Sequence, residues 1–164
     1  VEGVQVGIEQ TARVLLDKTG AVTAALERIA TMPEEKAKAD AGGLFDAYLN
    51  AFYRSLKAWR RGDELGGRLQ AAESAMHLVR LLFSLERRWT PYHDRLIPQL
   101  ALLETQGWPP GYLHEALLDL VRTGDPRRQQ EIEARVEALL RDRGYGSVVN
   151  AWGGEIERVR AFQF

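Results

Sequence analysis

The sequence predicts an all-α protein, an antiparallel bundle of about five to seven helices. Apolar residues recur at helical spacing through most of the chain. Glycine and proline interrupt this pattern at short intervals, so the connections between helices are short. At 164 residues, of which 45% are hydrophobic, the chain is long enough for one compact core.

Residues 1–10 differ from the rest because they alternate like a β-strand, with Val4, Val6 and Ile8 on one side. A single strand is not stable in water. We therefore expect residues 1–10 to be the remnant of a preceding domain and residues 11–164 to form the helical domain. A disordered tail is the alternative interpretation of this segment.

The first two helices are expected at residues 11–31 and 33–61. Thr19–Gly20 is a candidate interruption of the first helix. Pro33 suits the first turn of the second helix, because its missing N–H has no partner there in any case. Gly42–Gly43 is expected to weaken this long helix without ending it.

The next helix is the most apolar of the chain. Gly62 can end the preceding helix and Asp63 can cap this one, which then runs to about Arg88. Because several of its faces are apolar, we expect it at the centre of the bundle. Its expected buried seam consists of Leu65, Leu69, Ala72, Met76, Val79 and Phe83.

Proline and glycine also delimit the later helices. Thr90–Pro91, Pro109–Pro110 and Gly124–Asp125–Pro126 each combine a cap or stop with a first-turn proline. A last helix is expected from residue 147 onward, interrupted at Gly153–Gly154.

Three polar residues lie on one side of the apolar central helix. Glu73, His77 and Arg80 are spaced i, i+4 and i+7. Such groups are rarely buried unless they are paired or face a cleft. A glutamate at the edge of an apolar seam can act as a general base toward a hydroxyl group. Ion pairing along the helix is the alternative.

The helix expected at 33–61 carries a polar stripe at the same spacing, and the next turn adds further polar residues. Its stripe is a solvated face with internal ion pairs, or one wall of a cleft that attracts anions. Tyr92 and His93 follow the central helix and could return to its polar side. The stripe consists of Asp46, Asn50, Arg54, Lys57 and Arg61.

Composition excludes several classes of function. The chain has no cysteine, so disulfides and thiolate metal sites are excluded. The formal net charge of -1 argues against bulk binding to nucleic acid or to an anionic membrane, although a local basic face is compatible with it. No signal peptide, membrane span, P-loop or His-Glu-x-x-His motif occurs. These observations favour a cytoplasmic protein.

Two segments, FDAYLNAFYRSLKAWRRGDELGGRLQAAES and RRWTPYHDRLIPQL, resemble the helical C-terminal domain of bacterial nucleotidyltransferases of the kanamycin type. The resemblance covers about residues 45–100. The family phrases read Leu-Asn-x-x-Tyr-Arg-Ser-Leu-Lys, Asp-Ala-Ala-Glu-Ser and Arg-Pro-Tyr-Asn-Lys-Tyr-Leu. The chain departs from them at Gln70 and at residues 93–95, where His93, Asp94 and Arg95 replace Asn-Lys-Tyr, so the family's lysine has no counterpart here.

The resemblance implies that this domain supplies acceptor-site residues to a transferase. A glutamate on the helical domain is implied to deprotonate the accepting hydroxyl, and Glu73 is the candidate for this base. The candidate substrate-binding residues are Asn50, Tyr53, Arg54, Lys57, His77, Arg80, Tyr92 and His93.

The resemblance also implies what the chain lacks. The catalytic domain of the family carries a Gly-Ser motif and an Asp-x-Asp pair that holds magnesium and the nucleoside triphosphate, and neither occurs here. Mg and NTP are therefore expected only on a preceding catalytic domain, which is the expected partner together with a small-molecule acceptor. The chain alone is not expected to catalyse transfer. A homodimer is compatible with the sequence.

Two other interpretations stay open. Arg88 and His93 have the spacing of the arginine–histidine pair in HEPN-like nucleotide-binding or RNase toxin domains. A bundle without chemistry could instead use exposed Trp59, Trp89 and Trp108 as a surface for a protein partner.

Overall fold

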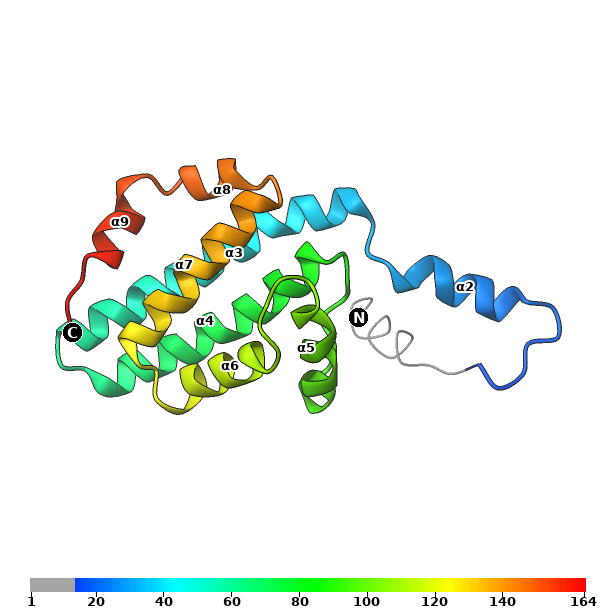
Figure 1. Ribbon diagram of the computed structural model, residues 1–164, viewed down its shortest axis with the longest axis horizontal. Helices are drawn as coiled ribbons and strands as arrows, with labels where there is room; N and C mark the ends of the chain where they lie inside the picture. Colours follow the sequence, from blue (N-terminus) through cyan, green and yellow to red (C-terminus); the bar gives the residue numbers. More distant parts are fainter. Residues whose placement is uncertain (1–13) are drawn as a thin grey trace.

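The computed structural model describes residues 14–164, which form a bundle of α-helices without a β-strand (Figure 1). The prediction of an all-α bundle is confirmed. The strand-like segment predicted at 1–10 lies outside the described residues. Within residues 14–164, no helix combines the length and apolar character needed to cross a membrane.

The helices follow one another with short connections. They are α2 (Ala21–Ala30), α3 (Glu34–Arg60), α4 (Glu64–Leu85), the 3₁₀ helix η1 (His93–Arg95), α5 (Leu96–Glu104), α6 (Tyr112–Arg122), α7 (Pro126–Asp142), α8 (Gly146–Asn150) and α9 (Gly154–Arg160).

Helices α3 and α4 form the long hairpin around which the bundle is built (Figure 1). Helix α3 runs unbroken through Gly42 and Gly43, because Ala41 and Phe45 beside them are fully buried and their packing outweighs the low helix propensity of glycine. Asp63 caps α4 as predicted, and its carboxylate accepts a hydrogen bond of 2.8 Å from the Gly66 N–H.

The two halves of α4 differ in burial, and the predicted seam is wrong for the N-terminal half. Leu65, Leu69 and Met76 are 70%, 61% and 46% exposed, whereas Val79 and Phe83 at the other end of the seam are buried. From residue 78 to residue 85 only Arg80 stays exposed. In the N-terminal half, the buried face instead carries the small residues Gly67, Ala71, Ser74 and Ala75.

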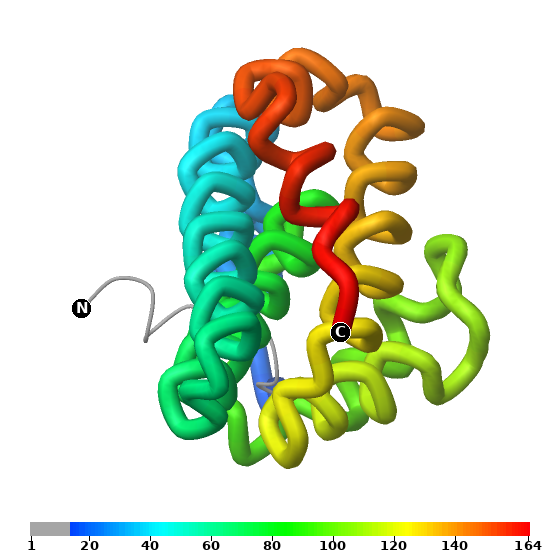
Figure 2. Tube along the Cα trace, turned by 90° about the vertical axis from the view of Figure 1, so that its left-hand side faces the viewer, coloured from blue at the N-terminus to red at the C-terminus, as the bar shows by residue number. Residues whose placement is uncertain are grey.

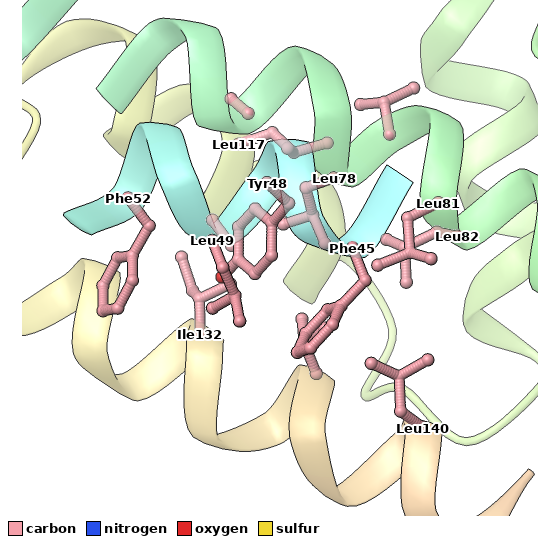
Figure 3. Packing of buried hydrophobic residues seen from close by; sticks show 14 of the residues in the cluster. Phe45, Tyr48, Leu49, Phe52, Leu78, Leu81, Leu82, Leu117, Ile132 and Leu140 are labelled. Carbon is pink, nitrogen blue, oxygen red and sulfur yellow. The ribbon is translucent and has the colours of Figure 1, made fainter. Parts of the chain in front are cut away.

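Aromatic residues of α3 fill the centre of the core (Figure 3). Phe45 and Tyr48 lie between α4 and α7, where Leu78 of α4 and Ile132 and Leu140 of α7 meet them (Figure 3). All of these side chains are at most 1% exposed, so the core joins the α3–α4 hairpin to α7, which is distant from it in the sequence.

One hydroxyl joins the same three helices. The Ser55 hydroxyl of α3 donates to the Gly67 carbonyl of α4 at 2.7 Å and accepts from the Gln129 side-chain amide of α7 at 2.9 Å. A Cβ atom on residue 67 would lie only 2.6 Å from Nε1 of Trp59, so the close approach of α3 and α4 requires glycine here.

The first predicted helix is shorter than expected. Residues 14–20 are not helical, and α2 begins only after Gly20, whose φ of 72° is accessible to glycine. No residue of α2 is buried, and the helix extends away from the bundle (Figure 1). Its attachment includes the Trp89 Nε1–H, which donates to the Ile29 carbonyl, and a backbone bond from Met32 N–H to Arg87.

The C-terminal segment is attached far more extensively. It lies between α3 and α7 (Figure 2). Arg160 donates to both carboxylate oxygens of Glu133 in α7 at 2.7 Å and also contacts Glu137. The side-chain amide nitrogen of Gln130 lies 3.1–3.2 Å from the carbonyls of Val159, Arg160 and Phe162. Helices α8 and α9 separate at Gly153, near the interruption that the sequence predicts.

Candidate functional site

A pocket of about 140 Å³ lies between α3 and α9. Helix α3 contributes Leu49, Asn50 and Tyr53 to its wall, and the C-terminal segment contributes Trp152, Glu155 and Ile156. The wall is mainly apolar, with an amide, a phenol and a carboxylate among its residues. This composition is typical of small-molecule sites, in which a few polar groups orient the ligand.

The pocket exists because α9 covers one side of α3. Ile156 and Val159 are buried against the core cluster that contains Leu49 and Phe52. At the pocket, the Trp152 indole N–H donates to the Asp46 carboxylate of α3 at 2.7 Å. The indole is thereby held against α3, so one wall of the pocket is fixed by a contact between residues 106 positions apart.

The side of the bundle nearest the pocket has a buried polar layer. Glu133 is fully buried and is satisfied by Arg160. Burial raises the pKa of the Tyr48 phenol well above its ordinary value, and the nearby Glu133 carboxylate raises it further. Tyr48 is therefore neutral through the physiological range, and this layer is structural support rather than a source of protons.

Charge changes sign along the outer face of α3. Asp46 lies near one end of the pocket, where Glu155 also contributes a carboxylate. Toward the other end, the Lys57 ammonium lies 4.9 Å from the centre of the Tyr53 ring. Arg54 follows the same face and is exposed. A ligand in this pocket would therefore meet acidic groups at one end and basic groups at the other.

The polar residues predicted on the central helix, which is α4, do not line this pocket. Glu73 and His77 approach each other to 3.9 Å, the geometry expected for an i, i+4 pair. The Glu73 side chain is 49% exposed, and Arg80 is exposed as well. The buried Nδ1 atom of His77 has no hydrogen-bond partner in the described chain. These three residues line a helix face but none of them lines the pocket at Asn50.

Tyr92 and His93 lie at the start of η1 and are exposed. Across residues 14–164, no hydrogen bond, ion pair or ring contact joins either of them to Glu73 or to the polar face of α3. The structure thus brings together Asn50 and Tyr53 at one pocket, with Arg54 and Lys57 on the same helix. Glu73, His77, Arg80, Tyr92 and His93 are not gathered there.

The features behind the two other interpretations also have structural explanations. The Arg88 guanidinium donates to the Gln99 side chain at 2.8 Å, and Arg88 lies beyond the end of α4 rather than on one helix with His93. The three tryptophans expected to be exposed are partly buried. Trp59 packs on Gly67, Trp89 bonds to Ile29, and Trp108 stacks on Tyr112 at 5.5 Å.

Sequence reasoning missed Trp152 and Glu155. They flank the Gly153–Gly154 interruption that the sequence does show. A tryptophan and a glutamate beside a chain reversal are a usable signal, but nothing local indicates that they face α3. Among residues 14–164, no group of three or more His, Asp or Glu side chains is arranged to hold a metal ion.

Residues 4–96 match the family described as a domain of unknown function, DUF4037, and this is more than half of the chain. The chain belongs to the DUF4037 family. The DUF4037 match includes α2, α3 and α4 and ends where α5 begins. It contains all of the predicted site residues, whereas Trp152 and Glu155 lie beyond it. Searches among curated proteins and among solved structures found no match.

Proposed function

We propose that this DUF4037 chain is the acceptor-binding helical domain of a nucleotidyltransferase and works with a catalytic domain that holds Mg and NTP. One observation carries the proposal: Asn50 and Tyr53, two residues of the phrase that resembles kanamycin-type enzymes, line the pocket between α3 and α9. The enzyme class rests on that resemblance, and the pocket supports the proposal because it has room for a small ligand beside these residues.

The groups around the pocket suit a small polar acceptor. The Asn50 amide can both donate and accept, the Tyr53 phenol can do the same, and the Glu155 carboxylate accepts only. Hydroxyl and amino groups can satisfy all three, while the apolar wall excludes water from one side of the ligand. Arg54 and Lys57 lie on the same helix and would position an anionic or polar substituent.

Glu73 has a separate role in this proposal. It lies on α4, outside the pocket, so it would act on an acceptor hydroxyl that projects beyond the pocket. Its half-exposed carboxylate has His77 at 3.9 Å as its ion-pair neighbour. A catalytic domain that packs on the N-terminal half of α4 would cover Leu65, Leu69 and Met76, which are exposed there, and would bring its metal site toward Glu73.

The test combines a binding assay with a transfer assay, using kanamycin as the probe acceptor. Calorimetry on the chain alone should show binding that Asn50→Ala weakens, while Asn150→Ala, the substitution of the other asparagine, leaves it unchanged. With a catalytic domain added, Glu73→Gln should abolish nucleotide transfer and keep kanamycin binding, and the exposed Glu115→Gln should affect neither. Full transfer by the Glu73→Gln variant would remove Glu73 from the proposal. Absence of any acceptor binding would refute the proposed domain function.

A further inference from the structure

Four cationic side chains at the C-terminal end of α3 differ from most other cations of the protein, because they have no acidic partner. Within residues 14–164, none of Arg54, Lys57, Arg60 and Arg61 takes part in an ion pair. Elsewhere, for example, Arg68 pairs with Glu64 and Arg141 pairs with Glu137, each at 2.6 Å. The formal net charge is only -1, so this local excess of positive charge is unusual.

The helix dipole explains only part of this cluster. Cations are favourable in the last turn of a helix, where the carbonyl ends are exposed, and Lys57 and Arg60 lie in that turn. Arg54 lies before the last turn, so the helix dipole does not account for its position. Mutual repulsion of four like charges within eight residues disfavours the arrangement, so an anion that binds there would remove an unfavourable interaction.

The same residues surround an open cavity. Lys57, Arg60 and Arg61 line a space of about 270 Å³. The space opens to solvent and is large enough for a phosphate group together with waters. The aliphatic stems of these side chains form most of the lining, and their ammonium and guanidinium ends supply donors of the kind that recognise a phosphate.

Aromatic rings hold two of the cations in place. The Lys57 ammonium lies 4.9 Å from the Tyr53 ring centre, and the Arg60 guanidinium lies 4.2 Å from that of Phe162. Contact with a ring face leaves the N–H edges of a guanidinium free to donate. The donors are therefore positioned before a ligand arrives, which lowers the entropic cost of binding.

The cation cluster and the apolar pocket are parts of one continuous face. Tyr53 lines the pocket and also carries Lys57 over its ring. With a rise of about 1.5 Å per helical residue, Lys57 lies about 6 Å and Arg61 about 12 Å beyond Tyr53 along α3. The Asp46 carboxylate lies about 16 Å before Lys57 along α3, at the other end of this face, and would repel a phosphate. This polarity fixes one orientation for a ligand with an apolar and an anionic end.

We propose that the outer face of α3 binds a phosphate monoester, with its phosphate at Lys57, Arg60 and Arg61 and its small apolar or aromatic group in the pocket between α3 and α9. The inference rests on the proposed function for the use of that pocket, and it adds an anion site beside the pocket. A monoester carries about 1.5–2 negative charges at neutral pH, which the cluster can neutralise.

Calorimetry on the full chain tests this with phenyl phosphate and inorganic phosphate as probes. Phenyl phosphate should bind about tenfold more tightly than inorganic phosphate, because it also buries a ring. The double variant Lys57→Ala/Arg61→Ala should weaken phenyl phosphate binding about tenfold or more, since it removes two charge-assisted contacts to the phosphate. Its matched control, Arg28→Ala/Arg95→Ala, removes two exposed cations elsewhere and should change nothing.

The pocket is tested separately by Asn50→Phe, which places a large side chain at its wall. This variant should reduce phenyl phosphate affinity to that of inorganic phosphate and leave inorganic phosphate binding intact. Equal affinities for the two probes in the wild-type chain would overturn the proposal, and so would an equal loss in the control double variant. Tighter binding of a short oligothymidylate, lost with Lys57 and Arg61, would also overturn it by assigning the cations to nucleic acid.

These results are independent of nucleotide transfer. Phenyl phosphate binding without any transfer activity would support the phosphate site and refute the transferase proposal. Kanamycin binding and transfer without phenyl phosphate binding would support the transferase proposal and refute the phosphate site.

Discussion

The two helices at the ends of the described chain, α2 and α9, show how differently a short helix can belong to a bundle. Helix α9 has only seven residues, yet Ile156 and Val159 are buried and Arg160 reaches a fully buried carboxylate. Helix α2 has ten residues and buries none. Tertiary contacts rather than length therefore decide which helix is part of the cooperative structure. The pocket at Asn50 lies beside α9, the more firmly attached of the two helices.

The largest effect is expected from Arg160→Ala. Glu133 would remain fully buried without its partner, and breaking a buried pair from one side typically costs about 3–5 kcal/mol. Urea unfolding followed by circular dichroism measures this loss. Arg158→Ala on the same helix removes an exposed pair with Glu155 and should cost no more than about 1 kcal/mol. Equal costs for the two variants would show that α9 is not anchored through Glu133.

An alkaline titration tests the buried layer beneath α9. The folded protein keeps Tyr48 neutral because burial raises the pKa of its phenol, whereas an unfolded tyrosine ionises near pH 10. The stabilising difference is complete below pH 10 and is lost as the pH rises above it, by about 1.4 kcal/mol per pH unit. Tyr48→Phe should remove this part of the alkaline loss, whereas Tyr92→Phe, at an exposed tyrosine, should keep it. Parallel alkaline curves for the wild type and Tyr48→Phe would contradict the assignment.

Gln130→Ala is expected to have an intermediate effect. Its amide nitrogen lies within hydrogen-bond distance of three carbonyls of the C-terminal segment, and the loss of such bonds costs about 1–2 kcal/mol. Hydrogen exchange should show faster opening of α9, with α4 unchanged. Faster exchange throughout the bundle would instead place Gln130 in its global core.

The smallest effect is expected in α2. Ala24→Gly in α2 and Ala134→Gly in α7 are the same change at exposed helical positions. Ala134→Gly should lower the free energy of unfolding by about 1 kcal/mol. Ala24→Gly should leave global unfolding unchanged and appear only as faster hydrogen exchange within α2. A similar destabilisation by both would show that α2 folds together with the bundle.

The sequence predicts the long elements well, because their boundaries depend on local chemistry. Pro33 and the Gly62–Asp63 turn locate α3 and α4 to within a few residues. The buried face of α4 could not be chosen in the same way. Leu65 and Leu69 satisfy a helical seam as well as the buried residues do, and only the position of neighbouring helices decides which face is covered.

The candidate site shows the same limit. Asn50 and Tyr53 could be named from their phrase, but the pocket that they line is completed by Trp152 and Glu155, about a hundred residues later. The assignment of Glu73 as a base stays a prediction. The sequence shows which helix face carries Glu73. It does not contain the acceptor or the catalytic domain that Glu73 would meet.

The Ser55 hydroxyl has a consequence for the order of folding. Its bond to Gly67 spans twelve residues, whereas its bond to Gln129 spans 74. Closing the shorter loop costs less chain entropy, so the α3–α4 hairpin should form early and the docking of α7 should follow. Gln129→Ala, which removes the bond to Ser55 and keeps the bond from Ser55 to Gly67, would then mainly accelerate unfolding, with a φ-value near zero. The DUF4037 match contains that early hairpin but ends before the helix that completes it.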